Sequence, residues 1–144
     1  MATRNGSAHW EGDLKSGKGK VTVGNGVFEG NYSFKTRFED GEGGTNPEEL
    51  LAASHAACFT MALSLLLTTE GHPPQALDTS ARAQLRNIDG APTITAMQLE
   101  TRGRVEGLDQ AKFEELAEQA KATCVISRAL AGVDEMTLTA TLEG

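Results

Sequence analysis

Apolar and polar residues alternate along the first part of the chain, in short runs that glycine-rich breaks separate. The runs cover 8–14, 20–24 and 27–38, and turn signals stand at Ser16-Gly17 and Gly24-Asn25-Gly26. A period of two is typical of strands that bury one face, and short glycine turns join such strands into hairpins. The pattern predicts a three-stranded antiparallel meander, followed by a flexible loop over 40–44.

A long apolar segment follows, and both of its ends are marked. Asn46 suits the N-cap of a helix, Pro47 its first position, and Glu49 the capping-box position. Gly71 and the two prolines soon after it end the helix. The segment predicts a helix of about 23 residues, or about 35 Å. Because it is apolar on most sides, we expect it to be central and covered on several faces, which one sheet alone cannot do.

In the second half of the chain, apolar and polar residues alternate again over two runs, and apolar residues then recur at the spacing of a helix. The runs 77–88 and 93–105 predict a hairpin that turns at Asp89-Gly90. Asp109 caps a second amphipathic helix that ends near Cys124. A short helical turn over 127–130 and a strand over 136–142 complete the order βββ-α-ββ-αα-β. This order predicts an α+β fold with the helices on one side of antiparallel sheets.

Composition and charge narrow the class of protein. The 144 residues, 39% hydrophobic and 23% charged, fit one folded domain over 1–144. The net charge of −7 and the pI near 4.9 argue against nucleic acid or an anionic membrane surface as a partner. The longest apolar tract, 50–67, contains polar residues and falls short of a membrane span.

The start of the chain lacks the apolar stretch of a secretory signal, so we expect a cytoplasmic protein. The cytosol keeps thiols reduced, and a disulfide between the two cysteines would be transient and catalytic. Cys58 lies among small apolar residues, where a thiol is often only a buried hydrophobic group. Cys124 stands where two helices meet, and a helix N-terminus can favour its thiolate. The residues alone leave a redox pair and two inert thiols both open.

Peroxide reduction would use two such thiols. A thiolate attacks the O–O bond and becomes a sulfenic acid, and a second thiol condenses with it to a disulfide. A guanidinium beside the first thiol would lower its pKa and orient the peroxide. Arg37 is the arginine that stands out, because it closes a predicted strand between aromatic residues. It also suits a surface position on that strand.

Four segments together resemble the OsmC/Ohr family of bacterial thiol peroxidases, and the OsmC branch more than the Ohr branch. They are AHWEG at 8–12, TRFE at 36–39, GTNPEEL at 44–50 and ASHAACFTMA at 53–62. The resemblance covers essentially the whole chain. The family usually reads Cys-Pro-Val-Ser at its second cysteine, whereas this chain has Cys124-Val125-Ile126-Ser127.

The resemblance implies an OsmC-like fold, an intertwined homodimer and a peroxidase without cofactor or metal. It implies that Cys58 is the peroxidatic thiol, Cys124 the resolving thiol, and Arg37 with Glu49 the activating ion pair. Organic hydroperoxides would be the substrates, hydrogen peroxide a poorer one, and an external dithiol the reductant.

The spacing of Glu49 and Cys58 along the predicted helix bears on the oligomeric state. Glu49 and Cys58 are nine residues apart, which on a helix is about 180° around and about 13 Å along the axis. If both serve one site, either the helix start is distorted or the glutamate comes from a neighbouring subunit.

Three alternatives stay open. His9, His55 and His72 with the cysteines could bind zinc, but no usual ligand spacing occurs. His55, three residues before Cys58, could be a base or a buried hydrogen-bonded histidine. Glu49 could be a helix cap only. The competing function is a dimeric stress protein that binds a small apolar ligand and whose thiols are merely buried.

Overall fold

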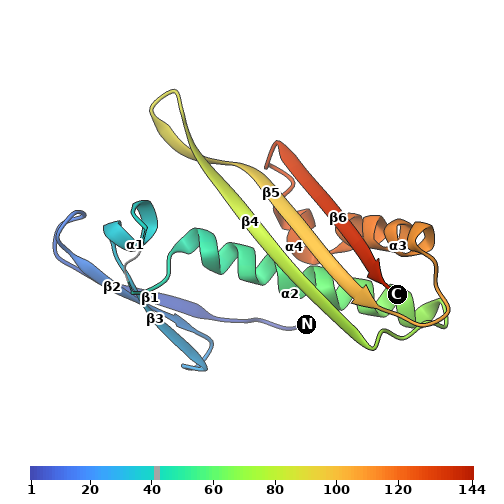
Figure 1. Ribbon diagram of the computed structural model, residues 1–144. Coiled ribbons are helices and arrows are strands. Elements are labelled where there is room, and N and C mark those ends of the chain that lie inside the picture. Colours follow the sequence, from blue (N-terminus) through green and yellow to red (C-terminus); the bar gives the residue numbers. More distant parts are fainter. Residues whose placement is uncertain (41–42) are drawn as a thin grey trace. The chain divides into compact units, whose positions relative to one another are not determined.

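The computed structural model describes residues 1–40 and 43–144 and shows two compact units, 1–50 and 51–144 (Figure 1). The predicted order of elements is confirmed, with one helix added after the third strand. That the chain is a single domain stays a prediction.

The first unit contains the predicted meander. Strands β1 (Gly6–Glu11), β2 (Lys18–Val23) and β3 (Phe28–Tyr32) form an antiparallel sheet in the order β1-β2-β3. Gly24 and Gly26 in the turn between β2 and β3 have φ of +60° and +95°, a region that favours glycine.

The predicted strand over 27–38 is wrong beyond Tyr32, because a short helix, α1 (Phe34–Phe38), replaces its second half. The Ser33 hydroxyl accepts from the Thr36 N–H at 3.2 Å, and the Thr36 hydroxyl accepts from the Ser33 N–H at 2.8 Å. This reciprocal cap starts a helix, in which Phe34 and Phe38 lie one turn apart with ring centroids at 4.9 Å. The predicted 40–44 loop includes residues 41–42, which lie outside the described part of the chain.

The long helix α2 (Pro47–Thr69) is confirmed. The Asn46 side chain caps it by accepting from the Glu49 N–H at 2.8 Å. The Glu49 carboxylate, expected to complete a capping box, accepts from the Thr45 hydroxyl at 3.0 Å. At the other end the His72 N–H donates to the Leu67 carbonyl at 2.8 Å across Gly71, whose φ is +86°.

By length and composition alone α2 could cross a membrane, since its mean hydropathy reaches 1.9. The core helix of a soluble protein meets the same criterion. Phe59, Leu63 and Leu67 of α2 are fully buried in the core of the second unit, which accounts for their apolar character.

The second unit is a three-stranded sheet with helices. Strands β4 (Ala76–Ile88) and β5 (Ala91–Arg104) form the predicted hairpin, with Asp89 and Gly90 at φ of +51° and +86°. These values suit a two-residue turn with both central residues left-handed. After α3 (Gln110–Thr123) and α4 (Val125–Ala129), strand β6 (Glu135–Glu143) pairs with β5 in parallel. The expectation of purely antiparallel sheets is therefore wrong for β6, because a crossover through helices returns the chain in the same direction.

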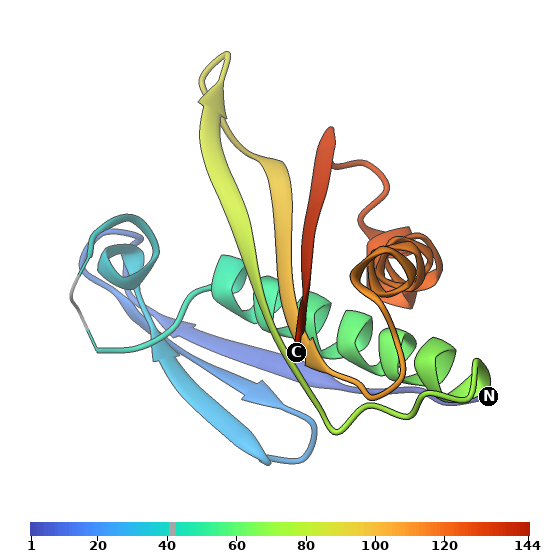
Figure 2. The same cartoon turned by 45° about the vertical axis from the view of Figure 1, so that its right-hand side comes forward.

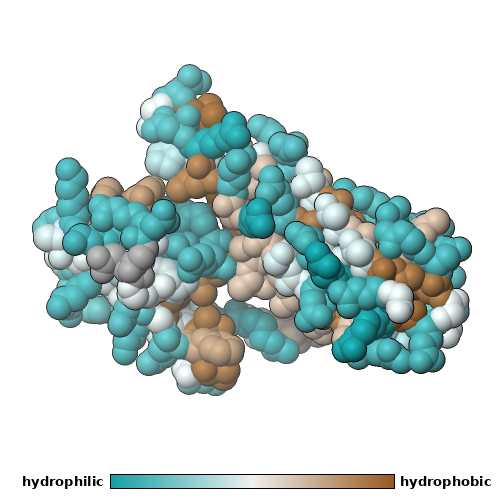
Figure 3. All heavy atoms as spheres, viewed as in Figure 1, coloured by the Kyte–Doolittle hydropathy of each residue, from teal (hydrophilic) through white to brown (hydrophobic). Residues whose placement is uncertain are grey.

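Helices α2 and α3 share one core with the sheet β4-β5-β6 (Figures 1 and 2). Leu99 of β5 packs in the same cluster as Phe59 of α2 and Phe113 of α3. The other face of this sheet carries exposed polar side chains such as Arg82 and Glu100, and many hydrophilic atoms are visible there in Figure 3. The helices thus lie on one side, as predicted.

Candidate functional site

The fold brings Cys58 of α2 and Cys124, the residue between α3 and α4, into contact. Both are free thiols, Cys58 packs against the core cluster that contains Cys124, and each thiol shifts the pKa of the other. Cys124 has φ −54° and ψ 128°, so the chain turns out of α3 there and begins α4 with the next residue. The 66 positions between the two cysteines in the sequence are closed by the core cluster to which α2 and α3 both contribute.

The first turn of α4 points backbone N–H groups at both sulfurs. Cys124 accepts from the N–H groups of Ser127 and Ile126, and Cys58 from those of Ile126 and Val125. The first N–H groups of a helix have no partner within the helix, so they are available for a thiolate. The sequence led us to expect that a helix N-terminus can favour the thiolate of Cys124. The N–H groups of α4 lower the pKa of Cys124 in this way, and they act on Cys58 as well.

The two thiols differ in acidity and in access. Burial, together with the neighbouring Cys124, raises the pKa of Cys58. Burial also raises the pKa of Cys124, but hydrogen bonds from the Ser127 N–H, from Cys58 and from the Ser127 hydroxyl bring it below its ordinary value. Cys124 is only 1% exposed, however, whereas Cys58 is partly exposed. Access favours Cys58 as the thiol that meets a peroxide, and a cation would be needed to make it the more acidic one.

His55 lies one turn before Cys58 and is fully buried. Its Nε2 is 2.8 Å from the hydroxyl of Ser127 on α4. Burial lowers the pKa of His55 and keeps its ring neutral. Of the two roles left open by the sequence, the structure shows the buried hydrogen-bonded histidine.

Arg37 lies in the first unit, on α1, and its ion-pair partner is Glu48 of the first turn of α2. Nε is 3.0 Å and 3.2 Å from the two carboxylate oxygens, and Nη2 is 2.7 Å from Oε1. The Glu48 side chain is 12% exposed. The expected partner, Glu49, bonds to Thr45 in this chain. Consecutive helix residues point about 100° apart, so only one of the two glutamates faces α1.

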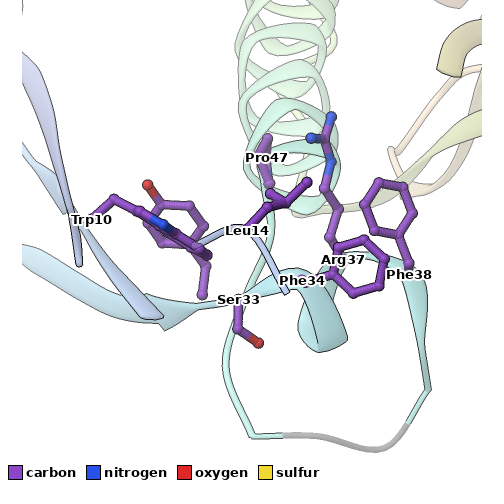
Figure 4. A pocket seen from close by; sticks show the side chains of 8 residues that line it. Trp10, Leu14, Ser33, Phe34, Arg37, Phe38 and Pro47 are labelled. Atoms are coloured by element: carbon purple, nitrogen blue, oxygen red, sulfur yellow. The ribbon is translucent and has the colours of Figure 1, made fainter. Parts of the chain in front are cut away.

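An apolar pocket of about 250 Å³ adjoins Arg37 (Figure 4). It is lined by Trp10, Leu14, Tyr32, Ser33, Phe34, Arg37, Phe38 and Pro47. The Trp10 and Tyr32 rings lie 5.4 Å apart, and the Arg37 guanidinium lies 5.2 Å from the Phe38 ring centre. A fixed cation beside apolar walls suits a ligand with an apolar body and a polar, electron-rich end.

Sequence reasoning selected Cys58, Cys124 and Arg37 but missed Glu48, Ser127 and the amides of α4. The Ser-x-x-Thr spacing at 33–36 could have revealed α1, and with it which glutamate faces Arg37. Among residues 1–40 and 43–144, no three His, Cys, Asp or Glu side chains gather as a metal site requires.

Comparison with known proteins relates the chain to one family. The family model described as OsmC-like protein matches residues 39–139. Peroxiredoxin OsmC of Escherichia coli K12 is 48% identical over 128 residues, which cover 88% of this chain and 89% of that protein. The organic hydroperoxide resistance protein OhrA of Bacillus subtilis is 33% identical over 97 residues, 67% of each chain.

A crystal structure supports the same relation. The organic hydroperoxide resistance protein of Elizabethkingia anophelis superposes with a TM-score of 0.77 at 26% identity. The match covers 99% of this chain and 98% of that one.

Proposed function

The chain belongs to the OsmC-like family, and we propose that it is a two-cysteine peroxidase that reduces organic hydroperoxides in the cytoplasm. The observation that carries the proposal is the contact of Cys58 and Cys124 at the N-terminus of α4. The relatives named peroxiredoxin and organic hydroperoxide resistance protein support the same chemistry.

The cycle uses each thiol once. The Cys58 thiolate attacks one peroxide oxygen, the O–O bond breaks, and the alkoxide leaves with a proton as the alcohol. Cys58 is now a sulfenic acid. The Cys124 thiolate attacks its sulfur, the S–O bond breaks, and hydroxide leaves as water once protonated. An external dithiol then reduces the disulfide and is itself oxidised.

Arg37, held by Glu48, supplies the cation in this proposal. The two-point contact fixes the plane of the guanidinium and leaves other N–H groups free to bind peroxide oxygens. A positive charge near Cys58 would offset the burial that raises the pKa of this thiol. The apolar pocket beside Arg37 supports organic hydroperoxides over hydrogen peroxide, which has no apolar body to place there.

An intertwined homodimer is part of the proposal. Helix α2 is regular from Pro47 to Thr69, so a distorted helix start does not bring a glutamate nearer to Cys58. If the glutamate and Cys58 serve one site, this supports the second possibility stated above, a glutamate from a neighbouring subunit. Met61 and Leu65, one turn apart on α2, are 75% and 68% exposed and offer an apolar face for such a subunit.

Turnover with a dithiol reductant tests the function. Wild type should reduce an organic hydroperoxide faster than hydrogen peroxide, and Cys58→Ser should abolish both activities. Cys124→Ser should allow one oxidation of Cys58 but form no intramolecular disulfide. The apolar pocket also fits the competing function of a non-enzymatic ligand-binding protein. No activity in wild type would reject the enzyme, and full peroxidase activity in Cys58→Ser would reject Cys58 as its peroxidatic thiol.

A further inference from the structure

A buried histidine and a buried serine connect α2 to α4 beside the two thiols. His55 is fully buried, Ser127 is nearly so, and His55 Nε2 lies 2.8 Å from Ser127 Oγ. Ser127 lies one turn after Cys124 on α4, and its hydroxyl is among the groups that lower the pKa of Cys124. A hydrogen bond between residues 72 positions apart thus connects α2 to the turn that carries Cys124 within the second unit.

The chemistry of these groups fixes the direction of the hydrogen bonds when Cys124 is a thiolate. The sulfur can then only accept, so the Ser127 hydroxyl donates to it, and the Ser127 oxygen accepts from the Nε2–H of His55. Nδ1 is left as a bare acceptor, and it has no hydrogen-bond partner in the part of the chain that the structure describes. The opposite tautomer would leave a buried N–H unpaired, which is rarer in proteins than an unpaired acceptor.

We propose that His55 is a positioning residue that acts through Ser127 to hold Cys124 as the thiolate that attacks oxidised Cys58. The inference rests on the proposed two-cysteine cycle and concerns its second step alone. Neither residue touches the peroxide, and His55 stays neutral throughout. The proton that Cys124 loses on becoming a thiolate is balanced by the proton that the leaving hydroxide takes up as water.

The burial of Cys124 explains why its attack on oxidised Cys58 depends on hydrogen bonds to the thiolate. The sulfur is almost completely buried, and burial disfavours its charged form. The hydroxyl of Ser127 is a donor that can rotate away, and the bond from His55 holds its oxygen in place. Backbone N–H groups of α4 serve both thiols, but the Ser127 hydroxyl is among the causes that lower the pKa of Cys124 only.

Single-turnover oxidation with one equivalent of cumene hydroperoxide separates the two steps. Sulfenic acid is trapped with a dione reagent, and disulfide is measured by mass. Ser127→Ala should slow disulfide formation about tenfold, since it removes a hydrogen bond to a charged acceptor, while sulfenic acid forms at the wild-type rate and accumulates. Ser127→Thr, which keeps the hydroxyl, should restore resolution. His55→Gln, which keeps a donor, should resolve faster than His55→Phe.

A second readout does not depend on turnover. In a Cys58→Ser background, the thiolate absorbance of Cys124 at different pH reports its pKa, and adding Ser127→Ala should raise that pKa. The inference is overturned if Ser127→Ala forms the disulfide at the wild-type rate. It is also overturned if sulfenic acid formation and disulfide formation slow equally and Tm falls, because a purely structural role predicts that result. If wild type itself forms no disulfide, the two-cysteine cycle fails. Separately, a Cys124 pKa that stays unchanged when Ser127→Ala is added to Cys58→Ser would reject the positioning role.

Discussion

At the scale of single residues, the candidate groups were predictable but most of their partners were not. The family resemblance implies that Cys58 and Cys124 pair, yet the sequence does not show which amides of α4 act on them. The choice between Glu48 and Glu49 shows the same limit, because a shift of one position turns a helix side chain by about 100°. Which glutamate faces Arg37 depends on the position of α1. Residues 34–38 form this helix, whereas the sequence pattern predicted a strand there.

The two glutamates provide a direct comparison. Glu48→Gln removes the charge that fixes Arg37, and kcat/KM for an organic hydroperoxide should fall about tenfold or more. Glu49→Gln is the matched control and should have a much smaller effect, since within residues 1–40 and 43–144 its carboxylate bonds only to the Thr45 hydroxyl. Steady-state kinetics of both variants show which glutamate is the functional partner of Arg37. A larger loss in Glu49→Gln would make Glu49 the functional partner.

Val125 stands where the family usually has proline, and the structure accommodates the change. Cys124 has a ψ of 128°, within the range that a residue before proline adopts. Val125 is 66% exposed at the first position of α4, where proline is well tolerated. The substitution adds one N–H, which donates to Cys58.

Val125→Pro should therefore keep the fold and raise the pKa of Cys58, because it removes a donor to the thiolate. At a fixed neutral pH less thiolate is present, so alkylation of Cys58 should slow. The pH profile of alkylation in a Cys124→Ser background measures this effect, with Val125→Ala as the control that retains the N–H. Identical profiles for the two variants would show that the amide of Val125 does not act on Cys58.

At the scale of elements, sequence pattern worked best where caps and turns were strong. Asn46, Asp109 and the Asp89-Gly90 turn mark their elements, and each has the expected hydrogen bond or backbone angle. The helix α1 was missed because Phe34, Thr36 and Phe38 alternate as in a strand, while the competing cap at Ser33 decides the outcome. The parallel pairing of β6 depends on a crossover through α3 and α4, a long-range feature that alternation within one strand does not encode.

At the scale of the whole molecule, the proposed homodimer implies that one site takes residues from two subunits. Arg37 and Glu48 lie in one compact unit of the chain, and Cys58 and Cys124 lie in the other. In the proposed cycle neither unit would suffice alone, since the proposed cation belongs to one and the proposed reactive thiols to the other.

Subunit mixing tests that arrangement. Arg37→Ala and Cys58→Ser should each be inactive alone. After unfolding and refolding as an equal mixture, half of the dimers are mixed and each has one intact site, so about a quarter of wild-type activity should return. Wild type diluted with Cys58→Ser serves as the control for refolding. If the mixture stays inactive while that control recovers, Arg37 and Cys58 act within one subunit.

The central claim is that one molecule of hydroperoxide converts the Cys58 and Cys124 thiols of one chain into a disulfide. Free thiols and intact mass, measured after one equivalent of an organic hydroperoxide, test it most directly. We predict that thiol titration falls to zero, that the chain loses two hydrogens, and that one linked peptide contains both cysteines. Two thiols that remain titratable after prolonged exposure would contradict the account.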